Sequence, residues 1–242
     1  MDMPRVSREK VRTVYNDLDN MWGADRWHAH TKAWLDHFLA KHALLSRTAQ
    51  IVLHVGSAGT DYGVKGGFTC HIDVAEKKLA GVVGAIVGDV HSLPIAPGTV
   101  DLCTCVGSVL NYCDAVISLL ELAAVVKPGG HLLIEFESSD SWEYIATPVY
   151  GLGVTSTLTF YSADPDCRLW VYSSRFIKDI LVGRGFVVRD ESRAHIVSSM
   201  VYRITKNERL AASFAVMDKI ARRIPFLRRG ASNIILLCQR LP

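Results

Sequence analysis

The stretch Ile51-Val52-Leu53-His54-Val55-Gly56-Ser57-Ala58-Gly59 decides how the rest of this 242-residue chain is interpreted. A short apolar run that ends in glycines is typical of a strand buried on both faces of a parallel sheet. Similar runs follow at residues 68–73, 85–88, 100–106 and 131–135. Strands that alternate with helices or short connections in this way indicate a parallel sheet with right-handed crossovers.

Helical patterns flank these runs. Residues 6–46 repeat apolar side chains at steps of three and four, and Gly23 is expected to divide them into two helices. Residues 115–126 carry a similar pattern between the fourth and fifth runs. Lys127-Pro128-Gly129-Gly130 follows directly, and a basic residue, proline and glycine in succession predict the end of that helix.

The patterns after Phe136 are less regular. Alternating residues predict a β-hairpin over 154–172, with its turn at 163–166. A helix from Ser173 to Leu181 and a strand at 186–188 follow, and residues 194–204 are a candidate for a further strand.

The end of the chain combines an amphipathic helix with a strand. Apolar side chains recur at helical spacing up to Pro225, and residues 233–238 predict the closing strand. The apolar positions of this helix are Leu210, Phe214, Met217 and Ile220.

Composition places the chain among globular proteins. Hydrophobic residues make up 49% and charged residues 21%, so the chain can bury a core. Its longest apolar runs, such as 234–238, are far shorter than the roughly 20 residues of a membrane span, and no signal peptide follows Met1. The six cysteines form no CxxC pair, which favours reduced, buried thiols in a cytoplasmic protein over a disulfide framework or a zinc site.

Positive charge gathers near the C-terminus. The whole chain has a formal net charge of +3, yet residues 201–242 contain nine Lys or Arg and two Asp or Glu. The excess lies at Lys206, Arg209, Lys219, Arg222, Arg223, Arg228 and Arg229. Such a stretch is either a solvated helix face or a surface for an anionic partner such as nucleic acid or a membrane.

Two turns carry a resemblance to a known family. Asp89-Val90-His91-Ser92-Leu93-Pro94 follows the third run, and Lys127-Pro128-Gly129-Gly130 precedes the fifth. In order and spacing, residues 50–137 resemble the class I S-adenosylmethionine-dependent methyltransferases. The resemblance implies an α/β fold with a doubly wound, mostly parallel, seven-stranded Rossmann-like sheet, an N-terminal helical cover and S-adenosylmethionine as the cofactor.

The resemblance also implies a domain organisation. We expect one methyltransferase domain over residues 1–242, with a helical cap at 1–48. A cofactor-binding half would follow at 49–137. A substrate-side half at 138–242 would hold the hairpin and the basic C-terminal helix.

The resemblance assigns the cofactor site to the carboxyl ends of the strands, where open parallel sheets bind ligands. Asp73 would accept hydrogen bonds from the ribose, and Asp89 and the Val90 amide would face the adenine. Residues 105–107 would lie under the methionine part. The implied cofactor contacts are Gly56, Ser57, Ala58, Gly59, Asp73, Val74, Asp89, Val90, His91, Cys105, Val106 and Gly107.

The glycine loop departs from the family pattern. The positions of the usual acidic residue and three glycines hold His54, Gly56, Ala58 and Thr60. The segment from Gly59 to Phe68 is too short for a helical crossover, so we expect a loop there. The residues expected to replace lost contacts to the amino-acid end of the cofactor are Thr60, Asp61, Tyr62 and Lys65. A nicotinamide-binding Rossmann domain is the nearest rival, but it requires a third glycine that opens a helix.

The catalytic residues carry weaker signals. Methyl transfer is an in-line displacement, and a hydroxyl acceptor also needs a base. Glu137 and His195 are candidates for that base or for the pocket wall. Tyr112 could shield the sulfonium by a cation–π contact or could pack against a helix.

The N-terminal helices contribute two further groups of side chains. Tyr15, Trp22 and Trp27 would line a lid or belong to the core. The histidines at 28, 30, 37 and 42 show no recognisable ligand pattern with Cys or carboxylates, so no metal site is expected.

Three functions remain open on the sequence. The first is O- or N-directed methyl transfer to a small molecule, enclosed by the N-terminal helices and the hairpin. The second is methyl transfer to a large anionic acceptor, such as tRNA or a membrane-associated lipid or glycan, held by the basic stretch. The third is a regulatory module that binds the cofactor without turnover, for which the altered glycine loop is the motivation.

Overall fold

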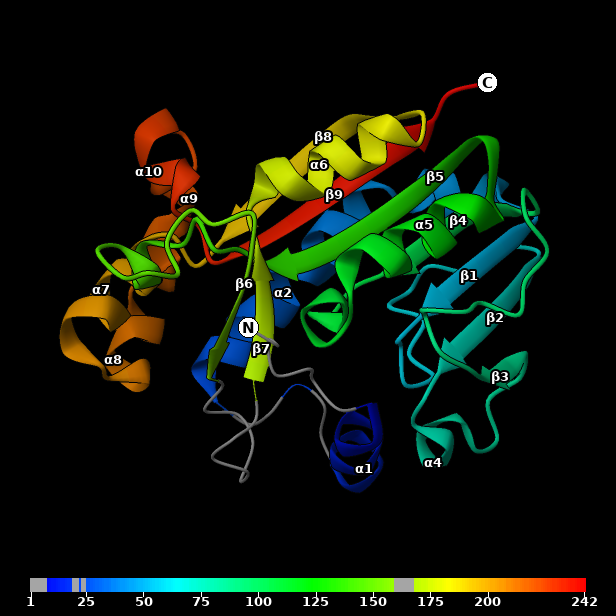
Figure 1. Cartoon of the computed structure of the whole chain (residues 1–242), viewed down its shortest axis with the longest axis horizontal. Coiled ribbons are helices and arrows are strands. Elements are labelled where there is room, and N and C mark those ends of the chain that lie inside the picture. Colours follow the sequence, from blue (N-terminus) through cyan, green and yellow to red (C-terminus); the bar gives the residue numbers. More distant parts are fainter. Residues whose placement is uncertain (1–7, 19–21, 23–24, 159–167) are drawn as a thin grey trace.

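A computed structural model describes residues 8–18, 22, 25–158 and 168–242, and its centre is a seven-stranded sheet in the order β3-β2-β1-β4-β5-β9-β8 (Figure 1). The strands are β1 (Ile51–Val55), β2 (Phe68–Asp73), β3 (Ala85–Val87), β4 (Val100–Cys105), β5 (Val126–Glu137), β8 (Phe186–Ala194) and β9 (Asn233–Arg240). Strands β1 to β5 run parallel, whereas β9 is antiparallel to both β5 and β8. The expected doubly wound, mostly parallel α/β sheet is confirmed, with β9 as its reversed strand.

Helices cover both faces of this sheet. They are α1 (Arg8–Asp17), α2 (Arg26–Lys41), α3 (Ala43–Thr48), α4 (Glu76–Leu79), α5 (Ala115–Val125), α6 (Ser174–Gly183), α7 (Val197–Thr205), α8 (Glu208–Ser213), α9 (Asp218–Ala221) and α10 (Pro225–Arg229). Three short 3-10 helices are η1 (Val109–Tyr112), η2 (Trp142–Tyr144) and η3 (Ala215–Met217). The expected break at Gly23 lies outside the described residues.

The apolar runs of the sequence form strands because alternate side chains enter two separate cores. Leu132 and Ile134 of β5 join the core beneath α5 and α6, whereas Leu133 joins the core beneath α2. In the second core, Leu35 and Phe38 of α2 pack on the sheet. A strand buried on both faces needs apolar residues throughout, as the sequence has them.

The first crossover is a loop, as expected. Residues 56–67 connect β1 to β2 through turns with positive φ at Gly56, Ala58, Gly59, Tyr62 and Gly63. At Gly56, φ is +68° and a Cβ would lie 2.5 Å from the side chain of Val109, so only glycine fits.

The hairpin prediction is confirmed, with β6 (Val154–Leu158) antiparallel to β7 (Arg168–Tyr172) in a separate two-stranded sheet. Its turn at 163–166 lies outside the described residues. Ser173 caps α6 by accepting a hydrogen bond from the Phe176 amide, as its position before the helix predicted.

The strand predicted within residues 194–204 is wrong, because α7 occupies this segment. The buried carboxylate of Asp218 accepts hydrogen bonds from the amides of Ile196 and Val197 at 3.1 and 2.9 Å, which stabilises the first turn of α7. This acceptor lies about twenty residues further along the chain, so the local sequence pattern does not reveal it.

The turn predicted at Lys127-Pro128-Gly129-Gly130 belongs instead to the first part of β5. Helix α5 ends at Val125 and Val126 already pairs with Val100, after which the register with β4 shifts. The glycine pair serves this irregular start of the strand, since φ is +80° at Gly129.

Cysteines and hydropathy add two findings. The five described cysteines are free and buried, while Cys167 lies outside the described residues. Across residues 8–18, 22, 25–158 and 168–242, no helix has both the length and the apolar character that crossing a bilayer requires.

Candidate functional site

A cleft opens at the carboxyl ends of β1 to β4, with about 730 Å³ of empty space including the part open to solvent. This volume lies in the range of small-molecule sites. Seven of the twelve predicted cofactor residues line it, namely Gly56, Asp73, Val74, Asp89, Val90, His91 and Gly107.

Asp73 presents a buried carboxylate at the end of β2. Its Oδ2 accepts a hydrogen bond from the Ala58 amide at 2.7 Å, and its Oδ1 accepts one from the Ala75 amide at 2.8 Å. Burial raises the pKa of Asp73, while these amide hydrogen bonds act in the opposite direction. The backbone therefore fixes the carboxylate, and each oxygen keeps a lone pair for a ligand hydroxyl.

Asp89 is held in a different way, by His91 and by α1. Its Oδ1 accepts hydrogen bonds from the amide and Nδ1 of His91 at 3.0 and 2.8 Å, and its Oδ2 lies 3.2 Å from Nε of Arg8. Although burial opposes ionisation, the His91 and Arg8 contacts lower the pKa of Asp89. Because Nε2 of His91 accepts the Asp114 amide, its Nδ1 carries the proton that Asp89 receives as a hydrogen bond.

The other five predicted cofactor residues lie off the cleft lining. Ser57 contacts His71 at 3.1 Å, and Gly59 packs against Val82. The Ala58 amide donates to Asp73 instead of facing the cleft. Cys105 and Val106 are buried in the two cores on opposite faces of the sheet.

Helix α1 closes one side of the cleft. Arg8, Val11 and Tyr15 recur at helical spacing and all line it, so one face of α1 points inward. The Tyr15 ring meets Tyr112 edge to face at 5.6 Å between centroids. Of the predicted lid aromatics, Trp22 adjoins Tyr62, whereas Trp27 stacks on His195 at 3.8 Å.

Glu135 holds the loop that follows β4. Its Oε2 accepts the amides of Gly107 and Ser108 at 3.0 and 2.5 Å, and its Oε1 accepts Nδ2 of Asn233 at 2.8 Å. Ser108 has φ +57°, a left-handed conformation that costs free energy for a non-glycine residue. The sequence analysis missed this role, although a carboxylate within an apolar strand was its signal.

Tyr62 brings an unusual polar group to the same region. Its hydroxyl is buried and has no hydrogen-bond partner among the described residues. It would lie 3.5 Å from a Cβ placed on Gly107, which lines the cleft. Burial raises the pKa of Tyr62 well above its usual value, so the hydroxyl keeps its proton and remains a donor.

Glu137 lies where β5 ends, beside the cleft but not in its lining. Burial and the charge of Glu135 raise the pKa of Glu137 to about 8, and a hydrogen bond with the Ser108 side chain opposes them. Asn111 fixes its backbone, since the Glu137 amide donates to Oδ1 of Asn111 at 2.9 Å. A carboxylate with a pKa near neutrality can exchange protons at physiological pH.

His195, the other candidate base, is not brought to the cleft. It is fully buried, with Nε2 2.8 Å from the hydroxyl of Thr31 and Nδ1 2.9 Å from that of Ser198. Burial lowers the pKa of His195 far below its usual value. Both nitrogens are occupied, so the ring serves packing between α2 and α7.

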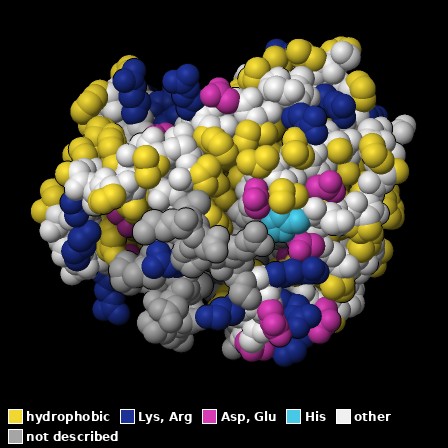
Figure 2. All heavy atoms as spheres, viewed as in Figure 1, with side chains coloured by type: hydrophobic (Ala, Val, Ile, Leu, Met, Phe, Trp, Pro, Cys, Tyr) yellow, Lys and Arg dark blue, Asp and Glu magenta, His cyan; other side chains and the backbone are white. Residues whose placement is uncertain are grey.

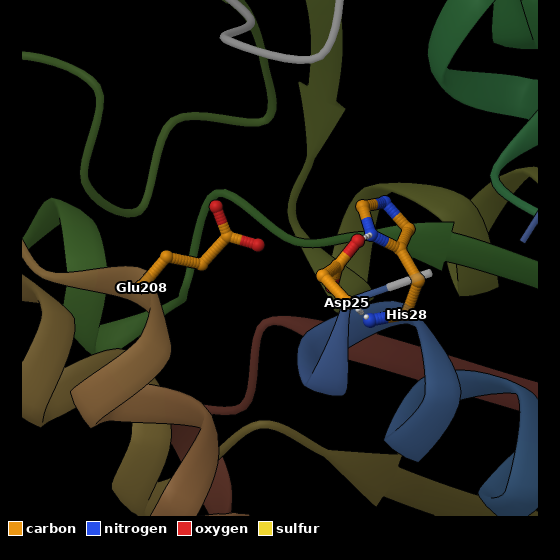
Figure 3. A group of neighbouring side chains, drawn as sticks. All are labelled: Asp25, His28 and Glu208. Atoms are coloured by element: carbon orange, nitrogen blue, oxygen red, sulfur yellow. Dashed lines mark hydrogen bonds and ion pairs between the residues drawn. The ribbon is translucent and has the colours of Figure 1, made fainter. Parts of the chain in front are cut away.

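A second group of polar side chains lies outside the cleft lining. Asp25, His28 and Glu208 place possible metal-ligating atoms within 4.8 Å of one another (Figure 3). The sequence analysis saw no carboxylate partner for His28, and the fold supplies two. Asp25 already binds the amide and Nδ1 of His28 at 2.9 and 2.6 Å, as the N-cap of α2.

Known proteins share this fold. A family model described as a methyltransferase domain matches residues 68–134, which run from β2 into β5. A structure of the [4+2]-cyclase SpnF has a TM-score of 0.61 at 14% identity, covering 100% of this chain and 98% of its own. A Mesorhizobium loti S-adenosylmethionine-dependent methyltransferase has 0.59 at 14%, covering 85% and 98%. The comparison with curated protein sequences finds no match.

A further similar structure carries a bound cofactor product. The Burkholderia thailandensis 1,6-didemethyltoxoflavin-N1-methyltransferase, with S-adenosylhomocysteine, has a TM-score of 0.56 at 16% identity, covering 100% of this chain and 94% of its own. At these identities, the similar structures speak for the fold.

Together with the family model, the sheet and its cleft define an enzyme of methyl transfer. The chain belongs to the class I S-adenosylmethionine-dependent methyltransferases, and S-adenosylmethionine is its cofactor.

Proposed function

We propose that this enzyme methylates an oxygen or nitrogen atom of a small-molecule acceptor. The observation that carries the proposal is the arrangement of the cleft. Two backbone-anchored carboxylates, Asp73 and Asp89, lie at one end, and the unpartnered Tyr62 hydroxyl and the proton-exchanging Glu137 lie at the other.

The residues of the cleft fit the cofactor. Asp73 would accept hydrogen bonds from the ribose hydroxyls, and Asp89 with the Val90 amide would face the adenine. Tyr62 would donate to the amino-acid end, where the glycine loop lacks its usual contacts. A buried hydroxyl without a partner costs free energy until a ligand satisfies it, which supports this role.

S-adenosylmethionine supplies an electrophilic methyl group. The chain must align the acceptor, exclude water and, for a hydroxyl acceptor, take up the released proton. Glu137 would receive that proton at its carboxylate, aided by a pKa of about 8. The Glu135 carboxylate would keep Gly107 and Ser108 in place beside the reacting atoms.

A compact acceptor fits the cover over the cleft. Helix α1 contributes Arg8, Val11 and Tyr15 to the lining, which leaves a confined space. The hairpin β6–β7 lies next to this region, because the Trp170 carbonyl accepts a hydrogen bond from Asn111 at 2.6 Å. The similar Burkholderia thailandensis enzyme has a small molecule in its name as acceptor, which supports the same class here.

The test is transfer of a labelled methyl group to fractions of a cell extract. The purified enzyme is incubated separately with the small-molecule, RNA and membrane fractions. Label in the small-molecule fraction, lost in the Glu137→Gln variant, supports the proposal. Label confined to RNA or membranes contradicts the small acceptor, and cofactor binding without label in any fraction indicates the regulatory module.

A further inference from the structure

The C-terminal lobe, defined as residues 197–229 in α7 to α10, exposes an unusual number of large apolar side chains. Of the twenty such side chains found exposed in the described residues, nine lie between positions 200 and 226. They are Met200, Ile204, Leu210, Phe214, Val216, Met217, Ile220, Ile224 and Phe226. Soluble monomers rarely gather apolar surface in this way unless something binds there.

The predicted amphipathic helix faces opposite to the usual direction. The structure buries its small side chains, which are Ala211, Ala212, Ala215, Asp218 and Ala221. The large ones on the other face form an apolar stripe, defined as Leu210, Phe214, Met217, Ile220 and Ile224, and they are 36–65% exposed. A helix that only completes a core would bury the large side chains and expose the small ones.

Basic residues run through this surface. Arg209, Lys219 and Arg223 are exposed, and no ion pair or hydrogen bond of their side chains occurs in the described part of the chain. Figure 2 shows basic and hydrophobic side chains intermixed over the lobe that Figure 1 labels α7 to α10. Their charges are therefore available to an anionic partner.

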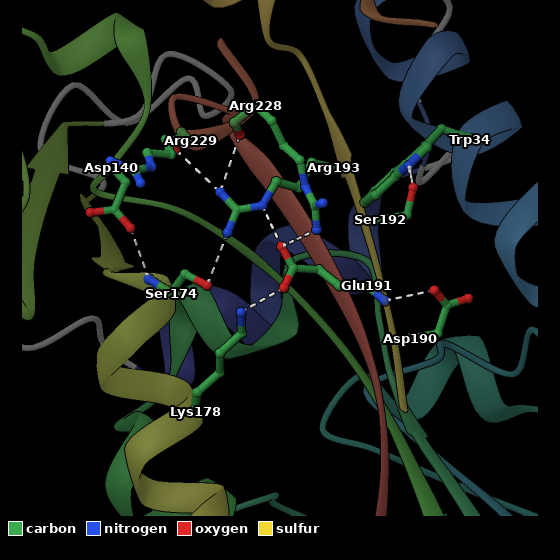
Figure 4. Close-up of polar contacts among 10 residues, drawn as sticks. All are labelled: Trp34, Asp140, Ser174, Lys178, Asp190, Glu191, Ser192, Arg193, Arg228 and Arg229. Atoms are coloured by element: carbon green, nitrogen blue, oxygen red, sulfur yellow. Dashed lines mark hydrogen bonds and ion pairs between the residues drawn. The ribbon is translucent and has the colours of Figure 1, made fainter. Parts of the chain in front are cut away.

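The lobe is firmly attached to the sheet. The Trp142 ring lies against Gly230, and its Nε1 donates to the Leu227 carbonyl at 3.0 Å. The Arg193 guanidinium donates to the carbonyls of Arg228 and Arg229 at 3.2 Å each and pairs with Glu191 (Figure 4). The apolar stripe is thus presented on a fixed support.

We propose that the C-terminal lobe docks this enzyme on the surface of an anionic membrane. Surface-lying amphipathic helices insert apolar side chains at the headgroup boundary while flanking Lys and Arg bind acidic lipids. Nucleic acid would use the charges but leave the aliphatic side chains in water. The core of a protein interface is depleted in charge, unlike this surface. The inference goes beyond the proposed function, because it concerns where the enzyme binds.

The experiment is co-sedimentation of the full chain with vesicles, without any measurement of methyl transfer. We expect binding to mixed phosphatidylcholine–phosphatidylglycerol vesicles, weakened by added salt, and little binding to phosphatidylcholine alone. Ile220→Glu or Phe226→Glu should each lower the partition coefficient about tenfold or more. Replacing Arg209, Lys219 and Arg223 together with Gln should lower it about 100-fold, roughly fivefold per charge.

Matched controls separate docking from general changes in charge or folding. Val83→Glu and Arg175→Gln alter side chains of 88% and 91% exposure outside the lobe and should leave vesicle binding unchanged. All variants should keep the circular dichroism spectrum and melting temperature of the parent. Equal losses in the controls, or no preference of the parent for anionic vesicles, would overturn the proposal.

Two further results would also overturn it. RNA that binds the lobe more tightly than vesicles and displaces them would make the surface a nucleic-acid site. A dimer of the parent that Ile220→Glu converts to a monomer would make it an interface between two copies of the chain.

Discussion

The two ends of the cleft are built on different principles. At the β2–β3 end, Asp73 and Asp89 are each held by backbone amides or by His91. At the β4–β5 end, Ser108 and Tyr62 have positive φ and Glu137 has a raised pKa. Strain and shifted pKa values gather where chemistry is performed, whereas a site that only binds can be fully satisfied beforehand.

The largest effect is expected at Glu137. Glu137→Gln removes the proposed base and should lower kcat for a hydroxyl acceptor about 100-fold or more. In the parent, the carboxylate accepts a proton only when ionised, so kcat should rise with pH up to about 8, following the pKa of Glu137. A pH series of initial rates for both proteins measures this.

The pH series has a clear contrary outcome. If Glu137→Gln keeps the same rise with pH, another group accepts the proton and the β4–β5 end loses its proposed base. His195→Gln is the matched control, because His195 is buried away from the cleft. Its variant should keep the pH profile of the parent, whatever its effect on stability.

The next effect is on folding. Glu135→Ala leaves the amides of Gly107 and Ser108 and the side chain of Asn233 without an acceptor. The free energy of unfolding should fall by about 3 kcal/mol, since each buried unsatisfied donor costs on the order of 1 kcal/mol or more. Urea denaturation measures this, with the exposed Glu76→Ala as a control that should change little.

Asp73→Ala tests the β2–β3 end. The variant should bind S-adenosylhomocysteine about 1–3 kcal/mol more weakly, because charged hydrogen bonds to the ribose are lost. Isothermal titration calorimetry measures the affinity, and Asp36→Ala on α2 provides a control remote from the cleft lining. Unchanged affinity in a folded Asp73→Ala protein would remove the ribose from this carboxylate.

The smallest effect separates the two ends directly. Tyr62→Phe should weaken S-adenosylhomocysteine binding about fivefold, the typical worth of one hydrogen bond. Methylthioadenosine lacks the amino-acid end, so its affinity should stay the same in this variant and fall only in Asp73→Ala. Equal losses of both ligands in Tyr62→Phe would show that the hydroxyl does not serve the amino-acid end.

The same contrast explains what the sequence could predict. Asp73 and Asp89 follow their strands directly, so local pattern and the family resemblance bring both to the cleft. The role of Glu135 depends on Asn233, which is 98 residues further along the chain. Helix α7 likewise depends on the distant carboxylate of Asp218. Contacts between distant segments therefore account for what the sequence analysis missed.

The alternation of apolar side chains had a similar limit. It predicted the strands, because both faces of each inner strand are buried. In the C-terminal lobe it identified a helical stripe correctly but could not tell that Ala211 and Ala215 would face inward. Periodicity shows that a helix has two faces, and only the packed structure shows which one meets the protein.

Helix α1 also bears on the timing of turnover. None of its ten residues is buried, although three of them line the cleft. Its attachments lie at the rim, where Arg8 pairs with Asp89 and Asp17 pairs with Lys77. A spent cofactor can leave this side only after these pairs separate, so the residence time of the product depends on side chains that never meet the reacting atoms.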